Sequence, residues 1–434
     1  MDGFDQNGSG PERPATNEDG DDIDELNEED IVQIVPLEDF LAADGRILEE
    51  SADNDDDDDD DEIEDGDMDH DGEEGEEGPS DEVDDAMLTL RGHSKDVFSV
   101  HAVDGLLASG GEDDHALLWS LSDNPPAEPQ LVVEGHSDSV TFVRFNSKGT
   151  LLASGDMSGK IIITNVAKKE RVAEYEDMTD LEWLQWHHGA DILFAGGGDS
   201  MVWMWLIANG QSKVFAGAGP GCTTGCLLPD GKRLLTGYED GSVRIWTLKD
   251  GTHSGLSGAQ GHVGPVVSLD AHPTLAIGAS GGQDGSVAIF QTDSGKITSV
   301  LRLGPRVSKP QSEEEEEEVV STEHSVEALA FAPTLPWLVT GTNSGSLILW
   351  DLNTGAARQN LQHPNGVVKC LWTDTHTLLS VGLDGVSRLW DARDGHVIHE
   401  WHGAGQEIFD VTFNPTKNLI ATGSRGGNIR IFQP

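Results

Sequence analysis

An eleven-residue pattern recurs eight times along this chain of 434 residues, and the repetition restricts the folds that the chain can adopt. Each copy begins with a small residue, continues through a polar turn rich in Gly and Asp, and ends in a run of strand-forming residues. The copies are SGGEDDHALLW (109–119), SGDMSGKIIIT (154–164), AGGGDSMVWMW (195–205), TGYEDGSVRIW (236–246), SGGQDGSVAIF (280–290), TGTNSGSLILW (340–350), SVGLDGVSRLW (380–390) and TGSRGGNIRIF (422–432). The pattern predicts a repeated β-sheet unit.

Successive copies begin 40 to 45 residues apart, except for one interval of 60 residues. A period of this length, with four short strands in each unit, is typical of WD40 β-propellers. One such sheet cannot bury both of its faces alone, whereas a closed ring of sheets buries them and leaves only short edges. The sequence therefore predicts an all-β WD40 β-propeller with eight blades, and seven blades are the alternative.

The two ends of the repeat region predict how the ring closes. The chain ends just after the strand NIRIF (428–432), so the last blade lacks an outer strand. The segment MLTL (87–90) precedes the first blade and has no sheet of its own. We expect it to supply the missing strand, which would pair the two ends of the propeller and remove an open edge.

Composition changes sharply at the start of this region. Residues 1–86 contain 39 Asp and Glu and two Arg, a net charge of −37, whereas residues 87–434 carry −17 and all eleven Trp. A segment with little apolar mass and strong self-repulsion cannot offset the entropy lost on ordering. We therefore predict a disordered acidic tail over 1–86 and a propeller over 87–434, with an acidic loop insertion at about 304–323 around Glu313–Glu318.

Two copies carry the full set of side chains that form a buried hydrogen-bonded tetrad in WD40 propellers. These sets are His93, Ser109, Asp113 and Trp119 in the first copy, and His363, Ser380, Asp384 and Trp390 in the seventh. A Ser–His–Asp set could also be catalytic, but a nucleophile needs one distinctive exposed serine with oxyanion donors. Repetition at equivalent places favours a structural role, so we predict no catalytic residue and no enzyme activity.

Other motifs point to neither a cofactor nor a metal. Cys222, Cys226 and Cys370 lack the spacing of a zinc site or a disulfide framework, which suits a reducing compartment. The segment DMDHDG (67–72) begins like an EF-hand loop, but Gly78 occupies the position of the essential Glu. No signal peptide or membrane-length apolar run is present. We predict a cytoplasmic monomer, with the nucleus as a second compartment.

Two segments leave alternatives open. The sequence WDAR places Asp391 and Arg393 in a WDxR pattern, which resembles the box by which some propellers dock on cullin-4 ligase adaptors. These residues could equally be ordinary ones that follow an inner strand. The apolar island at 31–41 within the acidic tail alternates like a strand and could add to the sheet of a partner, or it could be a hydrophobic cluster without a partner.

Several segments have a more specific sequence than the general WD40 pattern requires. They are EEDIVQIVPLED (28–39), GDMSGK (155–160), DLEWLQWH (180–187), LPDGKRLLTGYEDGSVRIWTLK (228–249) and SVGLDGVSRLWDARDG (380–395). Together they resemble the angio-associated migratory cell protein family. The resemblance implies two activities. Fungal relatives are dedicated chaperones that capture the basic N-terminal segment of a large-subunit ribosomal protein, and animal relatives are associated with cell migration and signalling.

Alignment of the copies predicts an acidic client-binding face at the Asp-Gly turns, with two aromatic anchors. Its residues are Asp96, Glu112, Asp114, Asp156, Asp180, Glu182, Trp183, Tyr238, Glu239, Glu327 and Glu407. Many weak ion pairs together can hold a peptide rich in Arg and Lys. Nucleic acid is a poor partner for such a surface because phosphate contacts require Lys and Arg.

The function predicted first is therefore a non-enzymatic chaperone that captures a basic ribosomal-protein segment for ribosome assembly. A signalling or cytoskeletal scaffold involved in cell migration is the alternative. A cullin-4 ligase substrate receptor is the second alternative.

Overall fold

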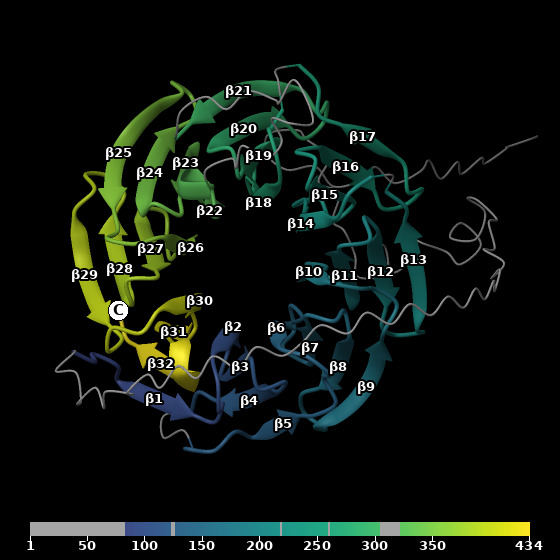
Figure 1. Cartoon of the computed structure of the whole chain (residues 1–434), viewed down its shortest axis with the longest axis vertical. Helices are drawn as coiled ribbons and strands as arrows, with labels where there is room; N and C mark the ends of the chain where they lie inside the picture. The colour runs from purple at the N-terminus through teal and green to yellow at the C-terminus, as the bar shows by residue number, and fades with distance from the viewer. Residues whose placement is uncertain (1–82, 123–125, 218, 259–260, 304–321) are drawn as a thin grey trace, which may run out of the picture.

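The computed structural model describes residues 83–122, 126–217, 219–258, 261–303 and 322–434. They form eight four-stranded sheets with antiparallel neighbours, arranged as the blades of a ring (Figure 1). The prediction of an all-β propeller with eight blades is confirmed. In the described residues no helix is long and apolar enough to cross a membrane.

Each blade is a meander of four strands, with the first strand innermost and the fourth outermost (Figure 1). Blades one to four contain β2 (Val97–Val103), β3 (Leu106–Gly111), β4 (Ala116–Ser120) and β5 (Leu131–Val133); β6 (Val140–Phe145), β7 (Leu151–Asp156), β8 (Ile161–Asn165) and β9 (Glu170–Tyr175); β10 (Leu181–Trp186), β11 (Ile192–Gly197), β12 (Val202–Leu206) and β13 (Gln211–Phe215); and β14 (Cys222–Leu227), β15 (Arg233–Tyr238), β16 (Val243–Thr247) and β17 (His253–Gly255).

Blades five to eight follow the same order. They contain β18 (Val266–Ala271), β19 (Ile277–Gly282), β20 (Ser286–Gln291) and β21 (Ile297–Arg302); β22 (Ala328–Phe331), β23 (Trp337–Gly341), β24 (Ser346–Asp351) and β25 (Ala356–Gln362); β26 (Val367–Trp372), β27 (Thr377–Gly382), β28 (Val386–Asp391) and β29 (Val397–His402); and β30 (Ile408–Asn414), β31 (Leu419–Ser424), β32 (Asn428–Phe432) and β1 (Leu88–Arg91). Two short 3-10 turns, η2 (Thr322–His324) and η3 (Arg425–Gly427), precede β22 and β32.

The apolar core lies between the blades. Buried apolar side chains form a cluster at every junction between neighbouring blades, as in the set that joins blades two and three. The second and third strands of a blade are covered on both faces, so their sequences are continuous apolar runs rather than alternating ones. In β8, for example, Ile161, Ile162 and Ile163 are all fully buried. Each blade therefore depends on both neighbours for its burial.

The ring closes as the sequence predicts. Strand β1 pairs with β32, with Leu88 opposite Ile431 and Leu90 opposite Ile429. The sheet of blade eight thus takes its outer strand from the beginning of the propeller and its other three strands from the end.

The contacts of the propeller begin slightly before the predicted boundary at 86/87. The carbonyl of Val83 accepts a hydrogen bond from Ala404 at 3.0 Å. Asp84 accepts one from Arg430 Nε at 3.0 Å, and the Asp85 amide donates one to the His402 carbonyl at 2.9 Å. The predicted disordered tail before Val83, its apolar island and the Glu313–Glu318 run lie outside the described residues.

Ring closure gives a first prediction. The Leu90 side chain is only 1% exposed and packs in the cluster between blades eight and one. We expect Leu90→Ala to lower the free energy of unfolding by about 2–5 kcal/mol, because it leaves a cavity at the closing strand. Met87, which is 58% exposed, supplies the control Met87→Ala. Denaturant titration measures both, and equal effects of the two substitutions would contradict this account of closure.

Candidate functional site

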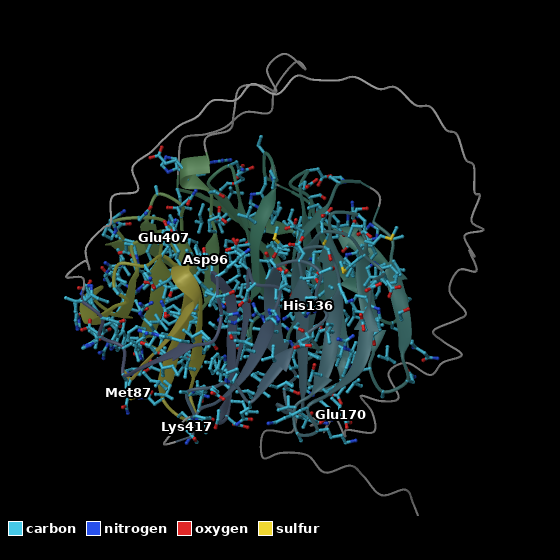
Figure 2. The ribbon with its side chains drawn as sticks, turned by 60° about the horizontal axis from the view of Figure 1, so that its bottom comes forward. Met87, Asp96, His136, Glu170, Glu407 and Lys417 are labelled. Atoms are coloured by element: carbon cyan, nitrogen blue, oxygen red, sulfur yellow. The ribbon has the colours of Figure 1, made fainter. Side chains whose placement is uncertain are left out.

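One end of the ring carries both the turns between the second and third strands and the loops that lead into the innermost strands. Antiparallel pairing places these two sets together. Figure 2 shows Asp96 and Glu407, from the loops before β2 and β30, on one side of the ring, and Met87, Glu170 and Lys417 on the other. We call the first side the turn face. All the predicted client-binding acids belong to its turns, its loops or the strand ends that adjoin them.

The tetrad of blade one is connected as the sequence predicts. His93 Nε2 lies 2.8 Å from Ser109 Oγ, and its Nδ1 lies 2.8 Å from Asp113 Oδ1. Trp119 Nε1 donates to Ser109 Oγ at 2.9 Å. Burial acts to raise the pKa of Asp113, but hydrogen bonds from His93 and the Ser94 amide outweigh it and hold the pKa below its usual range. Ser109 is fully buried, so a substrate cannot reach its hydroxyl.

The tetrad of blade seven contains an additional cation. His363 Nε2 lies 2.8 Å from Ser380 Oγ, and Trp390 Nε1 donates to the same hydroxyl at 2.8 Å. The distance from His363 Nδ1 to Asp384 is longer, at 3.5 Å. Arg388 fills this gap by bonding to Asp384 at 2.6 Å and to His363 Nδ1 at 2.7 Å. The buried polar network is therefore closed by an arginine from the third strand.

Asp156 belongs to a similar network, so its assignment to the client-binding face was wrong. The turn of blade two has Ser158 where the tetrad normally has Asp, and Asp156 takes over the role from two residues earlier. Its fully buried carboxylate lies 3.1 Å from His136 Nδ1 and accepts a hydrogen bond from Ser158 at 2.6 Å. His136 Nε2 lies 2.8 Å from Ser154 Oγ. These contacts hold the Asp156 carboxylate inside blade two, away from a client.

The two predicted aromatic anchors are also buried. Trp183 is 5% exposed and its indole N–H donates to Cys222 Sγ at 3.3 Å. Tyr238 is fully buried, and its hydroxyl lies 3.2 Å from that of Thr236. The guanidinium carbon of Arg244 lies 4.0 Å from the centre of the Tyr238 ring. Both rings fill the junction between blades three and four, so neither is available to a client.

Several predicted acids on blades one and eight already have partners within the protein. Glu112 pairs with Lys95 at 3.5 Å, and Glu407 pairs with Arg425 at 3.4 Å. Asp96 accepts a hydrogen bond from the Gly426 amide at 2.8 Å, which links the blade-one loop to η3. Asp114 is exposed in the turn before β4. Capture of a client by Glu112 or Glu407 would compete with a local cation.

Asp180, Glu182 and Glu239 differ from these acids because they form a cluster of like charge. All three are exposed. Asp180 directly precedes β10, Glu182 is its second residue, and Glu239 lies in the turn after β15. Partial burial and the nearby charges of Glu239 and Asp180 raise the pKa of Glu182. Among the described ion pairs, none involves these three carboxylates. We call these three residues the acidic cluster. Glu327, also exposed, lies on blade six before β22.

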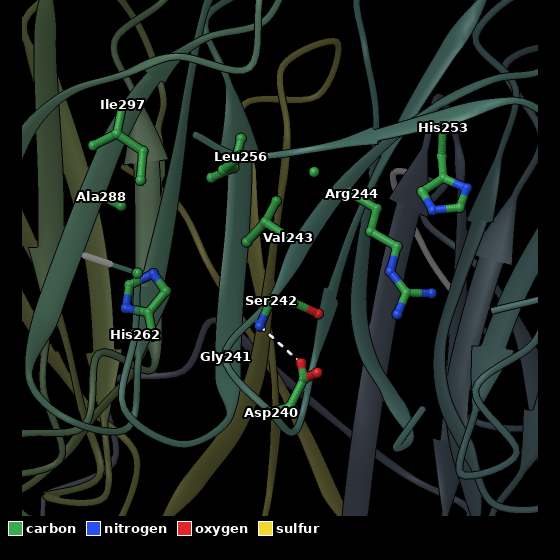
Figure 3. A pocket seen from close by; sticks show the side chains of 12 residues that line it. Asp240, Gly241, Ser242, Val243, Arg244, His253, Leu256, His262, Ala288 and Ile297 are labelled. Atoms are coloured by element: carbon green, nitrogen blue, oxygen red, sulfur yellow. Dashed lines mark hydrogen bonds between the residues drawn. The ribbon is translucent and has the colours of Figure 1, made fainter. Parts of the chain in front are cut away.

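A separate cavity of about 270 Å³ lies at the junction of blades four and five (Figure 3). Asp240, Arg244, His253 and His262 line it together with apolar side chains. Asp240 accepts a hydrogen bond from the Ser242 amide at 2.9 Å, as Figure 3 shows. His262 bonds to Ser280 and Ser286, both at 2.8 Å. Much of its polar lining thus serves the internal networks of the two blades.

Comparison with known proteins places this arrangement in a family. The model of the WD domain, G-beta repeat, matches residues 85–120, 127–165, 211–247, 317–351 and 395–433. The human angio-associated migratory cell protein is 38% identical over 368 residues, which cover 83% of this chain and 82% of that protein. The chain belongs to the angio-associated migratory cell protein family.

Fungal proteins are among the more distant relatives. The ribosome assembly protein SQT1 of Saccharomyces cerevisiae is 24% identical over 358 residues, which cover 75% of this chain and 80% of that protein. The crystal structure of Chaetomium thermophilum Sqt1 bound to the N-terminus of ribosomal protein L10 has a TM-score of 0.70 and 22% identity. It covers 81% of this chain and 100% of the Chaetomium chain. At this identity the similarity concerns the fold.

The WDxR residues of this family member form a local ion pair. Arg393 Nε donates to Asp391 Oδ1 at 2.9 Å, and the Arg393 amide donates to the same oxygen at 2.9 Å. The guanidinium is 66% exposed, whereas the Asp391 carboxylate is 8% exposed. These contacts lower the pKa of Asp391, mainly through the hydrogen bonds from Arg393. Asp391 therefore orients Arg393 at the surface, and adaptor docking stays a prediction.

The tetrads give a second prediction. We expect Trp119→Ala to lower the free energy of unfolding by about 3–5 kcal/mol, because it removes a buried aromatic side chain and one partner of Ser109. His93→Ala should also destabilise the fold, since it leaves Asp113 and Ser109 without their shared partner. Glu112→Ala, in the same turn with a side chain that is 41% exposed, is the control. Circular dichroism during denaturation measures all three, and a folded His93 variant of unchanged stability would exclude this role.

Proposed function

We propose that this protein is a dedicated chaperone that captures the basic N-terminal segment of a large-subunit ribosomal protein on its turn face. The acidic cluster of Asp180, Glu182 and Glu239 carries the proposal. Three like charges held close together cost free energy in the isolated protein. Partial burial first, and then the charges of Glu239 and Asp180, raise the pKa of Glu182. An Arg or Lys side chain from a client offsets this repulsion.

The comparisons support the choice of client. The Chaetomium thermophilum relative is bound to the N-terminus of ribosomal protein L10 in its crystal structure, and the Saccharomyces cerevisiae relative is a ribosome assembly protein. A chain with 80 Asp and Glu against 26 Lys and Arg is suited to a client of opposite charge. Ion pairs at an exposed face contribute little individually, so capture requires several of them and weakens as salt rises.

Charge reversal tests the proposal directly. We expect the double substitution Asp180→Lys and Glu182→Lys to weaken binding of an L10 N-terminal peptide by at least about tenfold, because repulsion replaces attraction. Isothermal titration calorimetry at low and moderate salt measures the affinity. Wild type should bind and should lose affinity as salt increases.

The control carries the same change of charge on the other side of the ring. It consists of Glu128→Lys and Glu170→Lys. Both acids are exposed at the end opposite the turn face, since Glu128 lies in the loop before β5 and Glu170 is the first residue of β9. This double variant should keep most of the wild-type affinity. Equal losses in the two variants would show that only net charge matters, and absence of binding by wild type would contradict the chaperone proposal.

The raised pKa of Glu182 gives a pH prediction. A bound cation favours the ionised carboxylate, so the pKa of Glu182 falls when the client binds and a proton is released. Affinity should therefore rise with pH between the pKa of the complex and that of the free protein, and then level off. Calorimetry in buffers of different ionisation enthalpy measures the released protons. Glu182→Gln should bind more weakly and release fewer protons, and unchanged proton release would rule out this linkage.

A further inference from the structure

The innermost strands share an irregularity that creates a ring of side chains around the axis. In seven blades the pairing of the first two strands shifts at the second residue of the innermost strand. In blade one, for example, Val97 pairs with Gly111 and Ser99 pairs with Gly110, so Phe98 has no partner. Such a β-bulge re-aims the side chain of the extra residue.

Blade six has the same position just outside its strand. Ala328 pairs with Gly341, which follows the small residue that opens its repeat, as Gly110 does in blade one. The preceding residue, Glu327, is therefore the equivalent of Phe98. The complete set from blade one to blade eight is Phe98, Thr141, Glu182, Thr223, Val267, Glu327, Val368 and Phe409. We call these eight residues the bulge ring.

Every member of the bulge ring is at least partly exposed, whereas the residue before each of them is buried. The preceding residues are Val97, Val140, Leu181, Cys222, Val266, Val326, Val367 and Ile408. The strands that carry the ring surround the axis of the propeller in Figure 1, and the ring lies near their first residues, at the turn face. It is therefore a surface that a peptide on this face can contact.

Apolar and acidic side chains occupy different parts of the bulge ring. Val368, Phe409 and Phe98 are consecutive members on blades seven, eight and one, and we call them the apolar arc. The rings of Phe98 and Phe409 have centroids 5.8 Å apart and a tilt of 56°. Glu182 and Glu327 lie on blades three and six, outside the arc. Figure 1 shows β26, β30 and β2 as neighbours along one side of the axis, with β10 elsewhere around it.

We propose that the apolar arc receives a bulky apolar side chain of the captured segment while Glu182 holds a neighbouring basic residue. This inference rests on the proposed function and specifies its client: a segment in which an aromatic or large aliphatic residue lies among Arg and Lys. A purely basic segment can pair with the acidic cluster but leaves the accessible part of the two half-buried Phe rings in water. Burial of apolar area against aromatic rings adds affinity that salt does not screen.

Two synthetic peptides test the inference without altering the protein. Both have the same length and the same number of Arg residues alternating with Ser, and one has a central Phe in place of a Ser. Calorimetry with the full chain should show roughly tenfold tighter binding of the Phe peptide. This preference should persist at moderate salt, because it does not depend on charge.

Substitutions locate the preference on the protein. The double variant Phe98→Ser and Phe409→Ser should bind the two peptides equally, at the wild-type affinity for the Arg–Ser peptide. Met157→Ser is the matched control, since Met157 is an apolar residue of the turn face, 51% exposed, in the turn after β7 rather than in the bulge ring. It should keep the full preference. Circular dichroism establishes that both variants are folded.

The outcomes separate this inference from the proposed function. If wild type binds both peptides equally and with strong salt dependence, the apolar arc has no role in recognition, and electrostatic capture still stands. If wild type binds neither peptide nor the L10 N-terminal peptide, the proposed function fails and the inference fails with it. A preference that survives in the double Phe variant would also overturn the assignment of the arc.

Discussion

The pairing of β1 with β32 is the interaction on which the rest of the structure depends. Each blade buries its apolar faces against two neighbours, so no blade is complete unless the ring is closed. Closure also fixes where the innermost strands begin, and these positions set the distances between the acids of the turn face. The proposed capture of a client benefits from fixed positions, because flexible acids would lose conformational entropy on binding.

Buried polar networks also fix the positions of the turns, and different blades build these networks from different residues. Blades one and seven use a full tetrad, and blade two places Asp156 in a related role. In blade eight, Arg430 bonds to Ser424 and Gln406, both at 2.9 Å, at the position where blade seven has Arg388. Each network holds a turn of the turn face against its own strands, so buried groups determine the positions of the exposed acids. The acids left without an internal cation are the ones that we propose for the contact with a client.

The sequence was sufficient for the fold because the repeat encodes it locally. The period predicts the blades, the unpaired segment before the first blade predicts the closure, and the spacing of His93, Ser109 and Trp119 matches their observed contacts. Alignment of the eight copies gave wrong predictions where a residue has the same backbone position as its counterparts but different side-chain contacts. Asp156 has the position of a surface acid and the partners of a tetrad acid. Tyr238 lies beside the turn, yet its side chain points into the junction between blades three and four, because neighbouring strand residues alternate between the two sides of a sheet. The bulge ring could not be read from the pattern, because a bulge is a property of strand pairing.

The apolar arc spans the point where the ring closes, since its members come from blades seven, eight and one. Phe98 is near the start of the propeller in the chain and Phe409 is near its end, so their rings can meet only after the last blade has been synthesised. The acidic cluster on blades three and four comes from one continuous stretch and needs no such event. A growing or open chain can therefore present negative charge before it presents the arc. The proposed recognition of a client by both surfaces would thus require a completed molecule.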